Sequence, residues 1–361
     1  MKEISKAVAR AEKFATRLGI RLPVLLAPMA GASPVSLSAA VANAGGMGAC
    51  GALLMKPDEI SAWCAEFRAQ SHGEFQVNLW IPGPTPKRDA ELEQRQREYL
   101  AQWGPEVSES AAEGVLPDFD AQCQAMLAAR PKAISSIMGL YAPEVFREMK
   151  ARGILWFATA TTVAEARAAE AAGADAIIAQ GAEAGGHRGT FDADEAVQRM
   201  VGLFVLLPQI VDAVSIPVIA TGGIADARGV AAALILGASA VMIGTGFLRC
   251  PEAKINPAWA DALGKTEADE TMITSAFTGR PGRGVANEYV RKSASPDAPP
   301  PAPYPLQRGF TRLMRETAAK EGKADRMQMW AGQSAKLALE EPAGQIATNL
   351  WELALNMLHS V

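Results

Sequence analysis

Short apolar runs alternate with alanine-rich helical patterns along most of the chain, and this alternation constrains the fold more than any other feature. Eight such runs are apolar on both faces, as are strands that are buried on both sides of a parallel sheet. The runs are Pro23–Ala27, Met47–Cys50, Phe75–Leu79, Ala133–Ile137, Ile154–Ala158, Ala176–Gln180, Pro217–Ala220 and Ala240–Ile243. Eight strands separated by helices predict an α/β fold, and the number eight favours a closed TIM (β/α)₈ barrel over an open doubly wound sheet.

The segments between the runs are predicted to form helices that cover the strands. Gly153, Gly173 and Gly237 each follow one of them, at the position where a left-handed glycine ends a helix. The predicted helices are Ser36–Ala44, Asp58–Gln70, Glu144–Arg152, Val163–Ala172, Arg199–Val214 and Ala227–Leu236.

Two segments interrupt the alternation. Residues 81–118 form an insertion after the third strand, and its polar part, Pro84–Trp103, is interpreted as an exposed charged helix. Ser293–Pro305 is rich in proline and is predicted to be a loop, because proline lacks a backbone donor. We therefore expect a barrel core over residues 1–250 that contains the binding site. A loop and helical extension over residues 251–361 is expected to pack on this barrel.

Composition excludes several classes of function. The 361 residues carry a net charge of -4, so there is no basic field to attract nucleic acid or an anionic membrane. No segment has the roughly 18 uninterrupted apolar residues of a membrane span, and the N-terminus lacks the apolar core of a secretory signal. A cytoplasmic protein with small-molecule partners is expected, and whether it forms a homo-oligomer is left open.

Cysteine and histidine are too sparse and scattered for a metal site. The four cysteines form no CxxC pair and are expected to be reduced, buried and inert: Cys50, Cys64, Cys123 and Cys250. Of the three histidines, His72 and His359 are expected at the surface, while His187 lies in a glycine-rich segment. His187 is therefore the candidate for chemistry.

The candidate site lies in the loops that follow the predicted strands, where TIM barrels carry their chemistry. Gln180–Gly189 reads QGAEAGGHRG, and its glycines allow a ligand to approach the backbone beside His187. Gly222–Gly223 and Gly244–Thr245 follow the seventh and eighth strands, where barrels frequently bind phosphate. The residues alone predict a pocket that suits a flavin mononucleotide (FMN) or a sugar phosphate. No GxGxxG sequence opens a helix after the first strand, so a Rossmann domain is not supported.

Four segments resemble motifs of the nitronate monooxygenase family, formerly called 2-nitropropane dioxygenases. Pro23–Gly48 contains APMAGA where the family usually has APMAGG, with Ala32 in place of the last glycine. Gln180–Gly189 resembles QGxEAGGHxG, Pro217–Leu248 resembles the phosphate-binding stretch, and Thr278–Tyr289 resembles a C-terminal motif. The resemblance covers most of the predicted barrel.

This resemblance implies a TIM barrel with non-covalent FMN that oxidises alkyl nitronates, and in some members nitroalkanes. The reaction uses O₂ and gives a carbonyl compound and nitrite. The resemblance also implies that His187 is the catalytic histidine, either as a donor to the nitro group or as the base that removes an α-proton. The positions that match flavin contacts are Met29, Asn78, Gln180, Gly185, Gly186, Gly222, Gly223, Gly244 and Thr245.

Two alternative functions stay open. Flavin-dependent enoyl-acyl-carrier-protein reductases and quinone reductases share the QGxEAGGHxG loop but take electrons from NAD(P)H. A non-catalytic flavin- or phosphate-binding protein is the alternative from another class. Arg188 is interpreted either as a residue that steadies a bound anion or as a solvated loop arginine. The seven tryptophans are too far apart in sequence to predict a common site.

Overall fold

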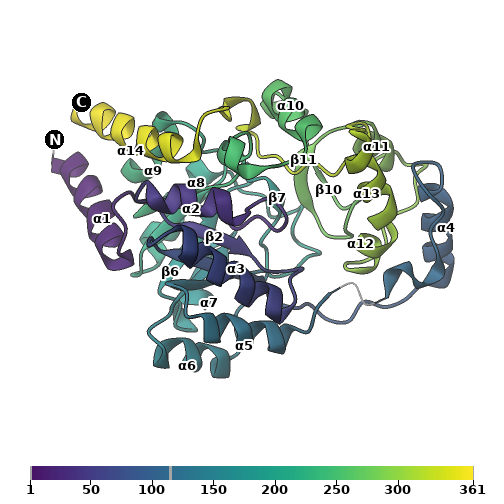
Figure 1. The fold of residues 1–361 in the computed structure, drawn as a ribbon, viewed down its shortest axis with the longest axis horizontal. Coiled ribbons are helices and arrows are strands. Elements are labelled where there is room, and N and C mark those ends of the chain that lie inside the picture. Colours follow the sequence, from purple (N-terminus) through teal and green to yellow (C-terminus); the bar gives the residue numbers. More distant parts are fainter. Residues whose placement is uncertain (1, 114–115, 361) are drawn as a thin grey trace.

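A computed structural model describes residues 2–113 and 116–360 and confirms the TIM barrel (Figure 1). Met1, Gly114, Val115 and Val361 lie outside the described residues, so the predicted insertion and extension are described without them. The eight parallel strands follow the order β1-β9-β8-β6-β5-β4-β3-β2, and a bridge between Leu25 and Met47 brings β1 beside β2. Their bounds are β1 Val24–Leu26, β2 Gly48–Gly51, β3 Phe75–Trp80, β4 Ala133–Ile137, β5 Leu155–Ala160, β6 Ala176–Gln180, β8 Val218–Thr221 and β9 Ala240–Ile243.

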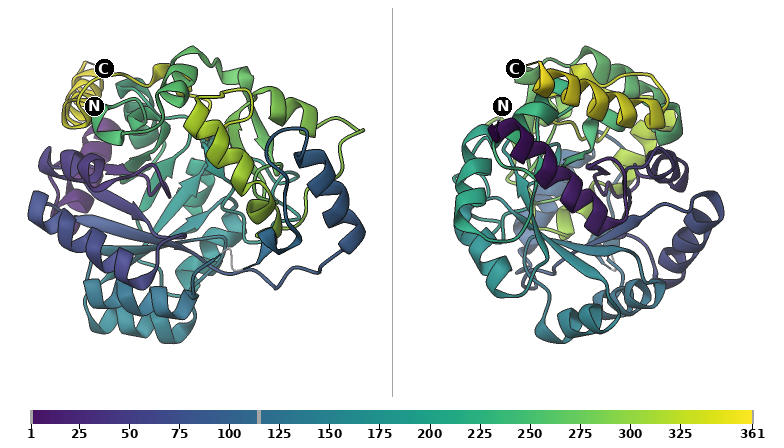
Figure 2. Two further views of the ribbon diagram at one scale, coloured as in Figure 1. Left: turned by 45° about the vertical axis from the view of Figure 1, so that its right-hand side comes forward. Right: turned by 90° about the vertical axis from the view of Figure 1, so that its left-hand side faces the viewer.

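A ring of helices covers these strands, and all six predicted helices lie within it (Figure 2). Thr162 and Glu165 begin α7 with a reciprocal capping box, which satisfies backbone donors at the helix start. The ring consists of α2 Val35–Asn43, α3 Pro57–Gln70, α5 Phe119–Ala129, α6 Pro143–Ala151, α7 Val163–Ala171, α8 Leu203–Ala213, α9 Ala227–Ile235 and α14 Ala343–His359. The last of these packs against α9 and α2, so the C-terminal helix takes the place that follows β9 in the ring.

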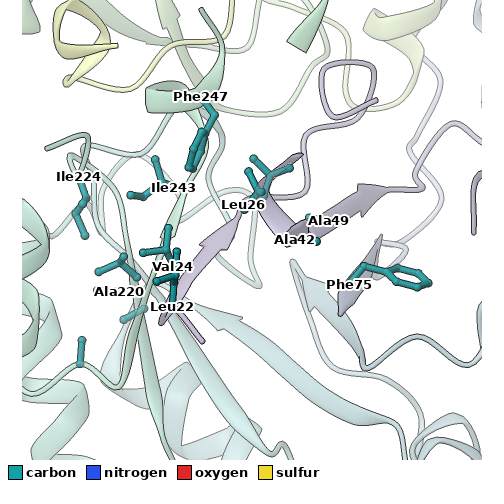
Figure 3. Packing of buried hydrophobic residues seen from close by; sticks show 14 of the residues in the cluster. Leu22, Val24, Leu26, Ala42, Ala49, Phe75, Ala220, Ile224, Ile243 and Phe247 are labelled. Atoms are coloured by element: carbon teal, nitrogen blue, oxygen red, sulfur yellow. The ribbon is translucent and has the colours of Figure 1, made fainter. Parts of the chain in front are cut away.

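The barrel has an apolar layer inside it and another between its strands and helices. Val24 of β1, Ala220 of β8 and Ile243 of β9 belong to the outer layer (Figure 3). Helix α1, Lys2–Leu18, lies across one end of the barrel (Figure 2). Its Phe14 and Leu18 side chains pack on the inner layer. This end of the barrel is therefore closed by side chains, which leaves the opposite end for a ligand.

The extension contains the predicted loop and helices, and it also contains two strands that were not predicted. Two strands, β10 Thr271–Thr274 and β11 Gly282–Val285, form an antiparallel pair, and β11 also pairs with β7, Gly186–His187. The strands escape a sequence reading because they are short and β11 contains two glycines, which leaves no alternating apolar pattern. The helices of this region are α10 Pro257–Lys265, α11 Glu288–Ser293, α12 Leu306–Phe310 and α13 Arg312–Glu321, besides α14.

The insertion contains helix α4, Ala90–Leu100, but this helix is not simply exposed as predicted. The Gln96 side chain donates to the carbonyl oxygens of Pro299 and Pro300 at 2.7 and 2.6 Å. Leu100 is fully buried in a cluster with Phe310 of α12. One face of α4 therefore packs on the extension, beside α12 (Figure 1), and the proline-rich loop lies over it.

The four cysteines are buried and free, as expected. Burial raises the pKa of Cys64 to about 11 and that of Cys250 to about 12, so neither thiol is a nucleophile near neutral pH. Within the described ranges, no helix has the length and apolar character that crossing a membrane requires.

The packing of α1 predicts the effect of a cavity at the closed end of the barrel. Leu18 is fully buried, so Leu18→Ala should lower the free energy of unfolding by about 2–5 kcal/mol. Leu353→Ala on α14 is the control, because Leu353 is 50% exposed and its truncation should change the free energy by about 0.5 kcal/mol. Urea unfolding measures both values. Equal losses in the two variants would contradict a packing role for α1.

Candidate active site

A cavity of about 400 Å³ lies at the carboxyl ends of the strands, within the size range of small-molecule and cofactor sites. Ile178 and Met242, which belong to the inner layer of the barrel, form part of its wall. All ten predicted site residues line this one cavity: Met29, Asn78, Gln180, Gly185, Gly186, His187, Gly222, Gly223, Gly244 and Thr245. Residues of the extension line it too, so the cavity lies between the barrel and the extension.

One side of the cavity offers backbone donors. Gly222 and Gly223 follow β8 with φ of +114° and +69°, conformations that favour glycine. Within the described residues, the N–H groups of Gly222, Gly223 and Thr245 donate no hydrogen bond. Unpaired N–H groups in adjacent glycine-rich loops suit the oxygens of a phosphate.

The backbone leaves open space at Gly186, whereas Gly244 lies in close contact with Met29. A Cβ atom at Gly186 would meet nothing within 4 Å, so the space beside this backbone is open. At Gly244 a Cβ atom would lie 3.3 Å from Met29 Sδ, which is tighter than ordinary van der Waals contact. The space and the free N–H groups together fit the ring and the phosphate of a flavin.

Gln180 holds the glycine-rich loop rather than offering its amide to a ligand. Its Nε2 donates to the carbonyl oxygen of His187 at 3.1 Å, and its Oε1 accepts from Gly189 N at 2.8 Å. Asn78 uses only its Nδ2, which donates to Ser135, so its Oδ1 remains available in the cavity wall. The two predicted amide residues therefore differ in what they can offer a cofactor.

The imidazole of His187 lies between two tryptophans. Its ring centroid is 4.6 Å from that of Trp80 and 4.8 Å from that of Trp330, both in edge-on geometry. Its Nε2 is 2.8 Å from Oγ1 of Thr278, in the turn between β10 and β11. Burial, and then the positive charges of Arg280 and Arg308, hold the pKa of His187 well below its usual value. The histidine is therefore neutral at pH 7.

Five arginines around the cavity have no carboxylate partner within ion-pair distance in the described parts of the chain: Arg188, Arg280, Arg283, Arg308 and Arg315. Arg308 and Arg315 line the cavity, and the Arg308 side chain forms no hydrogen bond with any described residue. Arg188 is fully buried outside the cavity lining and donates to the carbonyl oxygen of Gly181, so neither interpretation of Arg188 holds. The cavity is therefore positively charged.

A family model for nitronate monooxygenase matches residues 12–352 of the chain. The chain belongs to the nitronate monooxygenase family. It is 38% identical over 340 residues to a nitronate monooxygenase of Paraburkholderia phytofirmans, and the match covers 92% of both chains. The structure resembles a nitroalkane oxidase of Streptomyces ansochromogenes with a TM-score of 0.86 and 36% identity, covering 94% of this chain and 97% of that one. FabK of Thermotoga maritima gives a TM-score of 0.75 and 28% identity, covering 96% and 97%.

Membership in the nitronate monooxygenase family confirms the resemblance read from the sequence motifs. The chain is therefore an enzyme, a flavin-dependent oxidoreductase. The roles of its individual site residues stay predictions.

The residues that surround His187 in this enzyme were not predicted from the sequence. Trp80 could have been found, because it lies two residues after Asn78 at the end of β3, and alternate strand residues point to the same side. Trp330, Thr278 and Arg308 come from the extension, and no local pattern connects them with the barrel. The tryptophans are dispersed in sequence, yet two of them lie on either side of one imidazole.

The contacts of Gln180 predict how firmly the His187 loop is held. Gln180→Met keeps the side-chain volume but removes two hydrogen bonds, each worth about 0.5–1.5 kcal/mol. Hydrogen exchange should then be about tenfold or more faster at the Gly189 amide. Gln94→Met, on the exposed face of α4, is the control and should leave this exchange unchanged. Equal protection in both variants would show that Gln180 does not hold the loop.

Proposed function

We propose that this enzyme binds FMN in the cavity and oxidises an alkyl nitronate with O₂ to a carbonyl compound and nitrite. The observation that carries the proposal is the charge of the cavity wall. Two arginines line the cavity, and no aspartate or glutamate does so among the described residues. A nitronate is an anion, whereas its parent nitroalkane is neutral, so a cationic wall favours the nitronate.

The charge available to a ligand comes from Arg308 and Arg315. Burial, followed by the charge of Arg308, lowers the pKa of Arg315 to about 9, so Arg315 still carries its charge at pH 7. The Arg315 side chain donates to the carbonyl oxygen of Arg308 and to Oγ1 of Thr311. These bonds leave the guanidinium of Arg308 as the cation with free donors, and we propose that it holds the anionic substrate.

The residues of the cavity wall suit FMN, which when bound supplies the redox chemistry. The N–H groups of Gly222, Gly223, Gly244 and Thr245 would hold its phosphate. Met29, Asn78, Gln180, Gly185 and Gly186 would lie along its ring. Trp80 and Trp330 would exclude water from the space beside His187, which we propose as the catalytic histidine.

The buried cysteines and the lining of the cavity support proposals about the location and the organisation of the enzyme. We propose a cytoplasmic protein, which the four free and buried thiols support. Both the barrel core over residues 1–250 and the extension over residues 251–361 contribute to the cavity wall, and we propose that they act as one unit. Its partners would be a nitronate or nitroalkane and O₂.

Anaerobic reduction of the bound flavin tests the proposed electron donor. Ethyl nitronate should bleach the visible absorbance of the oxidised flavin rapidly, whereas NADH should bleach it slowly, because a cavity of about 400 Å³ that holds the flavin leaves space for a small anion but not for a second nucleotide. Chromatography of the flavin released from the same sample should identify FMN. Rapid bleaching by NADH alone would favour a reductase like FabK. A protein that cannot be loaded with any flavin would contradict both the nitronate oxidation proposed here and the alternative NAD(P)H-dependent reductase.

Arg308 provides a second test of the proposed function. Arg308→Met removes the free guanidinium but keeps an extended apolar side chain, so kcat/KM for ethyl nitronate should fall about 10- to 100-fold, as expected for a charged hydrogen bond. Arg312→Met is the matched control, because Arg312 is exposed on α13 and paired with Glu316. Equal kcat/KM values in the two variants would exclude Arg308 from substrate binding.

A further inference from the structure

The hydroxyl group of Thr278 connects the extension to the imidazole of His187. Thr278 is fully buried and lies in the turn between β10 and β11, 91 residues after His187. Its Oγ1 is 2.8 Å from Nε2 of His187. Thr278 does not line the cavity, whereas His187 does, so the hydroxyl contacts the ring from outside the cavity wall.

The other two contacts of this hydroxyl decide the direction of the hydrogen bond. Thr278 Oγ1 donates to the carbonyl oxygen of Arg280 at 3.1 Å, and a carbonyl oxygen can only accept. The N–H of Arg280 donates back to Oγ1 at 3.3 Å. A hydroxyl has one proton and two acceptor positions, so when its proton goes to the Arg280 carbonyl oxygen, the remaining position accepts from Nε2. Every group is satisfied when Nε2 carries the imidazole proton.

The other ring nitrogen, Nδ1, has no hydrogen-bond partner in the described part of the chain. The two tryptophans contact the ring in edge-on geometry, with ring centroids 4.6 and 4.8 Å from that of the imidazole. In a neutral imidazole with the proton on Nε2, the nitrogen Nδ1 carries an unshared electron pair. This is the nitrogen left for a ligand.

We propose that Thr278 is a positioning residue that fixes His187 as the Nε2–H tautomer and so makes Nδ1 a proton acceptor toward the substrate. The proposal rests on the proposed function and decides between the two roles of His187, because a nitrogen without a proton cannot donate to the nitro group. With a neutral nitroalkane, the α-proton passes to Nδ1, and the electron pair of the broken C–H bond stays on the substrate as the nitronate. The imidazolium keeps its Nε2–H bond to Thr278, and Arg308 balances the new anion.

The charged groups that act on the ring come from two elements. Arg280 lies in the same turn as Thr278, and Arg308 lies on α12, with the hydroxyl of Tyr304 near both. Both arginines oppose a positive charge on His187, and they also stabilise the nitronate that appears when the proton is transferred. The Nε2–H tautomer therefore allows Nδ1 of the neutral His187 to accept the α-proton of the substrate.

Nitrogen NMR of the holoenzyme tests the tautomer directly, because the chain has only three histidines. A ¹H–¹⁵N spectrum of the imidazole rings should show His187 with a protonated Nε2 and an unprotonated Nδ1. This pattern should persist as the pH of the sample is varied, and the exposed His72 and His359 give the other two sets of imidazole signals. A protonated Nδ1 in His187 of the unmodified enzyme would overturn the proposal, whatever the activity measurements give.

Thr278→Val removes the hydroxyl at nearly constant volume, and Thr278→Ser keeps it. In the valine variant the His187 signals should change toward the other tautomer, and the ratio of nitroethane to ethyl nitronate turnover should fall about tenfold or more, because only nitroethane needs a proton acceptor. The serine variant should keep the His187 signals and the turnover ratio of the unmodified enzyme. If the valine variant does not fold, the serine variant alone tests whether the hydroxyl is sufficient. Thr266→Val, which removes a buried hydroxyl at the end of α10, controls for a general effect. An unchanged ratio, or a serine variant that behaves like valine, would exclude the positioning role.

Discussion

The antiparallel pairing of β7 with β11 is the interaction on which the candidate site depends. Gly282 pairs with His187 and Arg283 pairs with Gly186, so two residues of a barrel loop become part of a sheet built by the extension. Successive side chains of a strand point to opposite faces, and a shift of one residue would exchange them. The observed register directs His187 into the cavity wall and leaves Arg188 fully buried on the other side. The turn that carries Thr278 reaches the imidazole because of the same register.

The uncompensated arginines show where this fold gives up stability for a binding site. A buried cation without an anion costs several kcal/mol, and a protein selected only for stability would pair or replace it. Arg280 and Arg283 are buried, yet they bond to backbone carbonyl oxygens rather than to carboxylates. Arg308 lacks even such partners in the described residues. An anionic ligand offsets this cost when it binds, so binding and stability are coupled.

Local sequence patterns were sufficient to predict the barrel, but they were insufficient to predict the contacts of the extension over residues 251–361. The strands could be predicted because each is an apolar run buried on both faces. The glycine-rich loops after the sixth, seventh and eighth runs could be found in the same way, whereas the full set of ten cavity residues came from the resemblance to the nitronate monooxygenase motifs. The contact of Thr278 with His187 spans 91 residues and depends on a strand of four residues, GRGV, which has no strand-like pattern. Arg188 and Arg308 are alike in sequence terms, and only the fold buries one and leaves the other without a partner. Residues whose role depends on local backbone conformation, such as the loop glycines, can be recognised in the sequence. Residues whose role depends on a tertiary contact, such as Thr278, cannot.

The place of the extension in the chain explains how it can hold such contacts. It begins after β9 and ends at α14, which returns to the helix ring between α9 and α2, so both of its ends are attached to the barrel. Two further contacts fix its middle: the pairing of β11 with β7, and the bond from Gly332 N to Thr245 Oγ1 at 3.0 Å. A cover joined at only one end could move relative to His187. A proton position defined by a 2.8 Å contact needs a support that is held on several sides, and this arrangement supplies it.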